Sequence, residues 1–267
     1  MTQKPDFFDF AAEVGLTKHI GSLDATKKLL TLCGIDQAKQ VLDVGCGAGA
    51  TPVFIAKEYG CRVLGVDIKA RMVERANEAA ARAGVSNLVE CRVGDAQNLP
   101  FENGLFDIVI TESVTALPED KQKAVNEYFR VTKPGGYVGL NESTWIKHPP
   151  TPEMEAWVKQ DVGGTAEPQT AEAWQALLEN AGLQEVQGIV SPIKVSDEAK
   201  GMMGRYGCRG ILRIYGRLIS LYLRSSDYRA FVKRVSQGGI VPKNLEEYFG
   251  YGLFVGRKPQ KMQASTE

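Results

Sequence analysis

Apolar runs rich in valine, leucine and isoleucine alternate along the first half of the chain with longer segments in which apolar residues recur every three or four positions. Short continuous apolar runs are typical of buried strands, whereas the longer period is typical of amphipathic helices. The pattern predicts strands at 40–44, 62–66, 88–92, 106–111 and 135–142 and helices at 51–59, 70–83 and 119–132. Strands connected by helices predict a parallel, doubly wound α/β sheet, which binds its ligand beyond the carboxyl ends of the strands.

The segments around this region carry weaker signals. Residues 6–34 predict one or two helices, with Asp24 as a candidate N-cap. The segment 143–169 predicts an irregular lid with a short helix at 152–160, and the next helix is capped at Thr170. We expect an N-terminal helical cover (1–34), a main domain (35–190 and 246–258), an insertion (191–245) and a flexible tail (259–267).

A glycine-rich turn follows the first predicted strand. The segment 41–52 reads VLDVGCGAGATP, and Gly45, Gly47 and Gly49 let backbone N–H groups approach a ligand that a Cβ atom would exclude. Asp67 ends the second predicted strand, from which a carboxylate can accept both hydroxyls of a ribose. The pair predicts a nucleoside site. The glycine spacing also satisfies the dinucleotide fingerprint, so the glycines alone do not select the cofactor.

Other residues narrow the choice of ligand. Asp43 precedes the first glycine, where its carboxylate would repel a pyrophosphate and attract the ammonium of an amino-acid-like ligand. Asp95 follows the third predicted strand, from which it can accept a hydrogen bond from the exocyclic amine of adenine. The segment 130–140 predicts a helix stopped by Pro-Gly-Gly and followed by a further strand. Together these features favour a zwitterionic nucleoside.

With these motifs in this order, residues 20–142 resemble the class I S-adenosylmethionine-dependent methyltransferases. The resemblance is to the small-molecule branch that includes the ubiquinone and menaquinone biosynthesis enzymes. It implies a Rossmann-like sheet of seven strands, mostly parallel, in which 183–190 and an antiparallel last strand at 248–256 complete the sheet. It also implies S-adenosyl-L-methionine as the cofactor and S-adenosyl-L-homocysteine as the product.

The resemblance implies a role for each cofactor-binding position. The glycine turn would surround the methionine part of the cofactor, and Asp43 would contact its amino end. Asp67 would hold the ribose, and Ile68 would cover the adenine face. Asp95 and Ala96 would bind the adenine edge. The full set implied is Asp43, Gly45, Cys46, Gly47, Gly49, Asp67, Ile68, Asp95, Ala96 and Thr111.

Candidates for catalysis are fewer. Glu112 ends the fourth predicted strand, where its carboxylate could attract a sulfonium or orient a substrate amine, or could cap a helix. His19 and His148 are candidate bases, although a lone histidine is more often a packing or surface residue. The aromatic residues within 7–10 could line an acceptor pocket. Methyl transfer from a sulfonium depends mainly on positioning and desolvation, so the lack of an obvious base does not argue against it.

Composition argues against several other functions. The formal net charge is zero, and 111–114 reads TESV in place of the Pro-Pro motif of base-amino methyltransferases, so we expect no nucleic acid partner. Five cysteines without C-x-x-C spacing and two histidines predict no metal site and reduced thiols. There is no signal-peptide pattern and no apolar run near the ~18 residues of a membrane span. We expect a cytoplasmic protein.

The insertion is strongly basic, with eleven Lys or Arg residues against three Asp or Glu residues in 191–245. On a helical wheel of about 100° per residue, Arg209, Arg213, Arg217 and Arg224 share one arc, opposite an apolar arc. One hypothesis is that 205–224 docks on an anionic membrane or a phosphorylated partner. The alternative is that the apolar arc packs on the main domain and the arginines are solvated or pair with acidic side chains.

The favoured function is methyl transfer to a small, apolar or amphipathic acceptor, beneath a cover formed by 1–22, 143–169 and 191–245. The alternatives are a membrane- or partner-docking module built on a cofactor-binding fold, and non-methyl chemistry on the same cofactor.

Overall fold

The computed structural model describes residues 7–15, 19–161, 166–193, 195–236, 242 and 244–260. The strands are β1 (Gln40–Val44), β2 (Arg62–Asp67), β3 (Val89–Val93), β4 (Phe106–Glu112), β5 (Thr132–Trp145), β6 (Gln169–Thr170), β7 (Gln184–Pro192) and β8 (Phe249–Arg257). The helices are α1 (Phe7–Val14), α2 (Ser22–Leu32), α3 (Ala50–Tyr59), α4 (Ala70–Ala83), α5 (Lys121–Val131), α6 (Pro152–Asp161), α7 (Ala171–Asn180), α8 (Val195–Arg224), α9 (Ser226–Ser236) and α10 (Leu245–Tyr248). The predicted tail from residue 261 onward lies outside the described residues.

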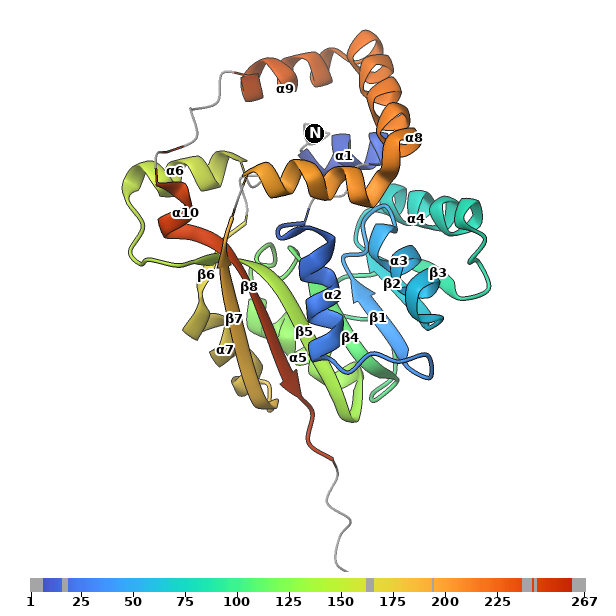
Figure 1. Ribbon diagram of the computed structural model, residues 1–267, viewed down its shortest axis with the longest axis vertical. Helices are drawn as coiled ribbons and strands as arrows, with labels where there is room; N and C mark the ends of the chain where they lie inside the picture. The colour runs from blue at the N-terminus through green and yellow to red at the C-terminus, as the bar shows by residue number, and fades with distance from the viewer. Residues whose placement is uncertain are drawn as a thin grey trace, which may run out of the picture.

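The strands form one sheet in the order β3-β2-β1-β4-β5-β8-β7, with the two-residue β6 paired to β5 (Figure 1). β8 runs antiparallel to both β5 and β7, while the neighbouring pairs from β3 to β5 are parallel. This confirms the predicted mostly parallel sheet with an antiparallel last strand. The strand order reverses between β1 and β4, which is where a doubly wound sheet binds its ligand.

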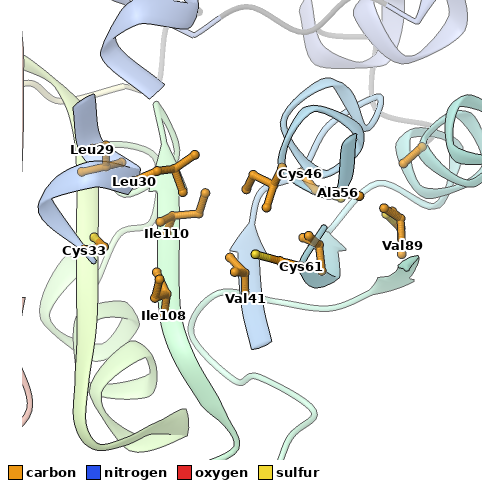
Figure 2. Packing of buried hydrophobic residues seen from close by; sticks show 14 of the residues in the cluster. Leu29, Leu30, Cys33, Val41, Cys46, Ala56, Cys61, Val89, Ile108 and Ile110 are labelled. Atoms are coloured by element: carbon orange, nitrogen blue, oxygen red, sulfur yellow. The ribbon is translucent and has the colours of Figure 1, made fainter. Parts of the chain in front are cut away.

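Helices cover both faces of the sheet because successive strand residues point to opposite sides. Val41 and Ile110 join the core under α2, α3 and α4, shown in Figure 2, whereas Leu42 and Val109 join the core under α5 and α7. These residues are fully buried, so the strands read as continuous apolar runs rather than as alternating ones. The five cysteines form no disulfide.

Some boundaries differ from the prediction. α2 begins at Ser22 after Gly21, whose backbone is left-handed, so Asp24 lies within the first turn and does not cap the helix. β5 continues to Trp145 because its last residues pair with β8. The predicted cap at Thr170 is confirmed, since its hydroxyl accepts a hydrogen bond from the backbone N–H of Ala173 at 3.3 Å.

The insertion forms α8 and α9, which frame α1 in Figure 1. Neither hypothesis for its apolar arc describes it fully. Ile214 is buried against the main domain, whereas Leu212 and Ile219 are 71% and 61% exposed. Arg217 turns inward and donates a hydrogen bond to the carbonyl oxygen of Val14 at 3.1 Å. Among the described residues no helix is long and apolar enough to cross a membrane.

Trp174 provides a test of the packing between α7 and the sheet. Its side chain is fully buried against Phe254, and its indole N–H donates to the carbonyl oxygen of Ser143 at 3.1 Å. Trp174→Ala should lower the free energy of unfolding by about 3–5 kcal/mol, because it leaves a cavity and an unpaired carbonyl. Urea denaturation followed by circular dichroism measures the change. Trp157→Ala, at a partly exposed position, is the control and should cost less.

Candidate active site

A cavity of about 280 Å³ lies at the carboxyl ends of β1, β2 and β4, beneath α1. We call it the strand-end cavity. Its walls are mostly apolar, with carboxylates placed at three strand ends or in the loops that follow them. The residues that line it are Phe8, Ala11, Val44, Gly45, Gly47, Asp67, Ile68, Lys69, Met72, Gly94, Asp95, Ala96, Gln97, Glu112, Ser113, Val114, Leu117 and Pro118.

The glycine turn forms one wall and is held by Asp67. Gly45 and Gly47 have φ values of 77° and 52°, and a Cβ atom on Gly45 would collide with the side chain of Val114. The backbone N–H of Gly47 donates to Asp67 Oδ2 at 3.0 Å, and that of Lys69 donates to Oδ1 at 2.9 Å. Burial raises the pKa of Asp67, although these two hydrogen bonds act to lower it. The carboxylate therefore fixes the turn and still faces the cavity.

The cavity lining also includes an uncovered apolar side chain and a further acid. Ile68 is 66% exposed although it lines the cavity, and such an uncovered side chain suits a flat ring packed against it. Asp95 lies close by, where its Oδ1 accepts a hydrogen bond from the backbone N–H of Gln97 at 2.9 Å. Ala96 lines the wall between them.

Glu112 is the most elaborately supported group in the cavity. Its Oε1 accepts hydrogen bonds from Thr26 Oγ1 at 2.8 Å and Asn141 Nδ2 at 3.2 Å, and its Oε2 accepts one from Thr51 Oγ1 at 2.9 Å. His19 Nε2 lies 3.7 Å from Oε2. Burial acts to raise the pKa of Glu112, but the charge of His19 and the three hydrogen bonds outweigh it and lower the pKa. The carboxylate is thus held ionised at a fixed position.

Of the three candidate catalytic residues, His19 and Glu112 lie next to each other in the structure. His19 is buried behind Glu112 and does not line the cavity, and its Nδ1 lies 3.3 Å from the carbonyl oxygen of Ile20. His148 is exposed beyond the end of β5 and is not part of the cavity. Its place in an irregular segment between β5 and α6 could not be related to the sheet from sequence alone.

Four residues of the implied cofactor set do not line the cavity, namely Asp43, Cys46, Gly49 and Thr111. Side chains alternate along a strand, so Thr111 points away while Glu112 points in, and Asp43 points away while Val44 lines the cavity. Thr111 Oγ1 lies 3.3 Å from the hydroxyl of Thr115. Cys46 packs into the apolar core.

Asp43 is nevertheless chemically unusual. It is 2% exposed, and its Oδ2 has no hydrogen-bond partner among the described residues. Burial, followed by the negative charges of Glu112 and Asp67, raises its pKa well above the ordinary value. An unsatisfied carboxyl one residue below the cavity wall suits an indirect contact with a positively charged ligand group.

The partners of Glu112 were not found by sequence reasoning. Thr26, Thr51 and Asn141 come from α2, α3 and β5, and no local spacing links them. The loop after β4 was missed as well, although Ser113 has a φ of 59°, which is uncommon for a residue with a Cβ atom.

Glu142 holds that loop in place. Its Oε1 accepts hydrogen bonds from the backbone N–H groups of Val114 and Thr115, at 2.9 and 2.7 Å. Burial raises the pKa of Glu142 to about 7, although the backbone hydrogen bonds act to lower it.

α1 covers the strand-end cavity and is anchored by charged groups. Lys69 Nζ lies 2.6 Å from Asp9 Oδ1, and Arg75 Nη2 donates to the carbonyl oxygen of Glu13 at 3.2 Å. On its other side, Phe10 packs against Tyr228 of α9, with ring centroids 5.1 Å apart.

Residues 41–136 match a protein family described as a methyltransferase domain. Over 226 residues the chain is 30% identical to an uncharacterized protein of Haemophilus influenzae, a match that covers 84% of this chain and 89% of that protein. The chain belongs to the class I S-adenosylmethionine-dependent methyltransferases. The family resemblance drawn from the sequence motifs is thereby confirmed.

Methyltransferases with named activities match shorter parts of the chain. Norajmaline N-methyltransferase of Rauvolfia serpentina is 40% identical over 97 residues, which are 36% of this chain and 33% of that enzyme. The 27-O-demethylrifamycin SV methyltransferase of Amycolatopsis mediterranei is 31% identical over 161 residues, which are 60% of this chain and 59% of that enzyme. The matches thus span about one third and three fifths of these relatives.

Solved structures share the fold. The (4+2) cyclase SpnF has a TM-score of 0.72 at 20% identity, covering 94% of this chain and 92% of that chain. Phosphoethanolamine N-methyltransferase 2 of Haemonchus contortus, in complex with phosphomonomethylethanolamine and S-adenosylhomocysteine, has a TM-score of 0.67 at 19% identity, covering 95% and 57%. At these identities the likeness concerns the fold alone.

S-adenosylmethionine is the cofactor of this methyltransferase family. The strand-end cavity of this chain fits such a group in three respects. The glycine turn leaves room that a Cβ atom would fill, Ile68 offers an uncovered apolar face, and Asp43 has an unpartnered buried oxygen.

Glu142 should make the stability of this methyltransferase depend on pH. The pKa of Glu142 is higher in the folded state than in the unfolded state. Its contribution to the unfolding free energy is therefore fully present below the unfolded pKa and is lost as the pH rises through about 7. The unfolding free energy of the wild type relative to Glu142→Gln should therefore fall by roughly 1–3 kcal/mol between pH 5 and pH 8. Urea titrations at several pH values measure this difference. Glu102→Gln, at an exposed loop position, should show no such trend.

Proposed function

We propose that this chain catalyses S-adenosylmethionine-dependent methyl transfer to a small, apolar or amphipathic acceptor. The observation that carries the proposal is the lining of the strand-end cavity, which combines Asp67 and Asp95 with the buried carboxylate of Glu112. The small-molecule acceptors in the names of the norajmaline and rifamycin methyltransferases support the substrate class. The apolar side chains of Phe8, Val114 and Leu117 in the walls fit an acceptor with apolar surface.

In this proposal the chain's own residues bind and orient. Asp67 accepts hydrogen bonds from the ribose hydroxyls, Asp95 accepts one from the adenine amine, and Ile68 packs on the ring. The cofactor, when bound, supplies a methyl group that is transferred to an acceptor lone pair and leaves S-adenosylhomocysteine. The cavity has mostly apolar walls and α1 covers part of it, so in this proposal the two reactants are held together, which can supply about 7–11 kcal/mol of the barrier reduction.

Glu112 acts in this scheme as a fixed negative charge. A carboxylate whose pKa is lowered is a weak base at neutral pH, so it is better suited to attracting a sulfonium or an acceptor ammonium than to removing a proton. His19 touches neither reactant and is a positioning residue, because it keeps Glu112 ionised. Asp43 lies below the wall, where its raised pKa favours the neutral carboxyl until a positively charged ligand group binds nearby.

The cofactor site is tested by Asp67→Ala. The variant should bind both S-adenosylmethionine and S-adenosylhomocysteine about 10–100-fold more weakly, since charge-assisted hydrogen bonds contribute roughly 1.5–3 kcal/mol. Isothermal titration calorimetry on folded protein measures both affinities. Asp24→Ala, which removes an exposed carboxylate from α2, should bind like the wild type. Unchanged affinity in Asp67→Ala would refute the assignment.

Glu112→Gln should change the affinity for S-adenosylmethionine more than the affinity for S-adenosylhomocysteine. S-adenosylmethionine carries a sulfonium charge and S-adenosylhomocysteine does not, so loss of the carboxylate should weaken the first by roughly tenfold relative to the second, or about 1.4 kcal/mol. Asp95→Asn is the matched control, because both ligands share the adenine and should weaken equally. An equal loss for both ligands in Glu112→Gln would mean that Glu112 only supports the fold.

His19 is tested by the pH dependence of that same preference. Without the histidine charge the pKa of Glu112 should rise, so His19→Gln should lose the preference for the charged ligand at a higher pH than the wild type does. A pure packing role would weaken both ligands and leave this pH unchanged.

The reaction itself is tested by turnover of methyl-labelled S-adenosylmethionine with lipids, quinones, thiols and amines. Label transfer supports the proposal. Conversion of an acceptor without formation of S-adenosylhomocysteine would instead favour non-methyl chemistry in the same cavity.

A further inference from the structure

A second cavity, of about 300 Å³, lies between α3, α4 and α8. It shares no lining residue with the strand-end cavity. Four arginines line it, Arg75 and Arg82 from α4 and Arg213 and Arg217 from α8. We call it the arginine cavity, and α8, which belongs to the insertion, provides part of its lining.

The positive charge in the arginine cavity is not balanced by its neighbours. Glu78 is the acid that pairs with these arginines, at 3.1 Å from Arg75 Nη1 and 3.3 Å from Arg82 Nη1. Arg213 makes no hydrogen bond or ion pair with the described residues, and the buried Nε of Arg75 has no partner among them. Burial, followed by repulsion from Arg75, lowers the pKa of Arg217. Four arginines therefore line one cavity, and among the described residues the ion pairs given for them are those of Arg75 and Arg82 with Glu78.

A purely structural role explains only part of this cluster. Arg75 and Arg217 each donate one hydrogen bond to the last carbonyl oxygens of α1, at Glu13 and Val14, and so satisfy the end of that helix. Arg82 and Arg213 have no such role. Packing alone would not gather four like charges around an open space, because the repulsion lowers stability.

The start of α3 adds to the positive potential. Gly49 and Ala50 line the arginine cavity, and Gly49, the N-cap residue, provides no side-chain acceptor for the first turn. The first backbone N–H groups of a helix carry partial positive charge and bind anions readily. The helix end and the arginines therefore favour the same kind of ligand in the same place.

We propose that the arginine cavity binds a phosphate group, carried by a small phosphorylated molecule or by a lipid headgroup. The planar guanidinium group donates paired hydrogen bonds that match phosphate oxygens. Several arginines around one space therefore suit a phosphate ligand better than they suit a ligand with one carboxylate. The volume is at the lower end of the range for small-ligand pockets, which is roughly 300–1,000 Å³. The exposed Leu212 and Tyr215, next to Arg213 on α8, make a lipid a concrete source of the phosphate.

The experiment uses the full chain in the absence of the cofactor. Inorganic phosphate is titrated by calorimetry at constant ionic strength, with chloride as the comparison anion, and co-sedimentation is measured with phosphatidylcholine vesicles with and without phosphatidic acid. We expect saturable binding to phosphate, to the phosphatidic acid vesicles, or to both. Arg213→Gln and Arg82→Gln should each weaken it about tenfold or more. Arg224→Gln, which removes an exposed arginine of α8 outside the cavity, should not.

The two arms distinguish the sources. Binding of free phosphate indicates a soluble ligand, whereas binding confined to phosphatidic acid vesicles indicates a headgroup. The proposal is overturned if neither probe binds saturably, if chloride binds equally well, or if both cavity variants bind like the wild type. Titration of the same preparations with S-adenosylhomocysteine reports on the strand-end cavity, so failure here is separable from failure of the proposed methyl transfer.

Discussion

The buried carboxylate of Glu112 is the interaction on which the site depends. Taking an ionised carboxylate out of water costs several kcal/mol unless donors replace the lost hydration. Here Thr26, Thr51 and Asn141 provide them, and they come from α2, α3 and β5. One side chain therefore ties three elements to the end of β4, and these elements hold Glu112 from behind the wall that it forms in the strand-end cavity.

A second constraint acts on the cover. α1 is a short helix, and such helices are not stable alone. It is held by Asp9 and Lys69 on one side and by the contact between Phe10 and Tyr228 on the other, while the arginines of the second cavity satisfy its last carbonyl groups. Through Arg217 the insertion thus supports the cover of the strand-end cavity, whereas Arg213 takes no part in that support.

The same fold serves diverse chemistry among the proteins with similar structures, which include a cyclase and an N-methyltransferase. What separates them must therefore lie in the residues at the cavity rather than in the sheet. In this chain the cavity has the ionised carboxylate of Glu112, with His19 Nε2 3.7 Å from it, and apolar walls at Phe8 and Leu117. In the function that we propose, both features favour transfer controlled by position and charge over transfer controlled by proton abstraction.

The sequence by itself determined the sheet, its mostly parallel direction, the cavity at the strand ends and the places of Asp67 and Asp95. These follow from local signals, since apolar runs, helical periods and glycine turns act over a few residues. The strand-end acid Glu112 was visible too, but its partners were not. Thr26 and Asn141 are far apart in the chain and meet only when α2 packs on β5, a contact that no spacing encodes. The orientation of α8 was likewise decided by tertiary packing, because an amphipathic pattern specifies an apolar arc but not which part of it the domain covers.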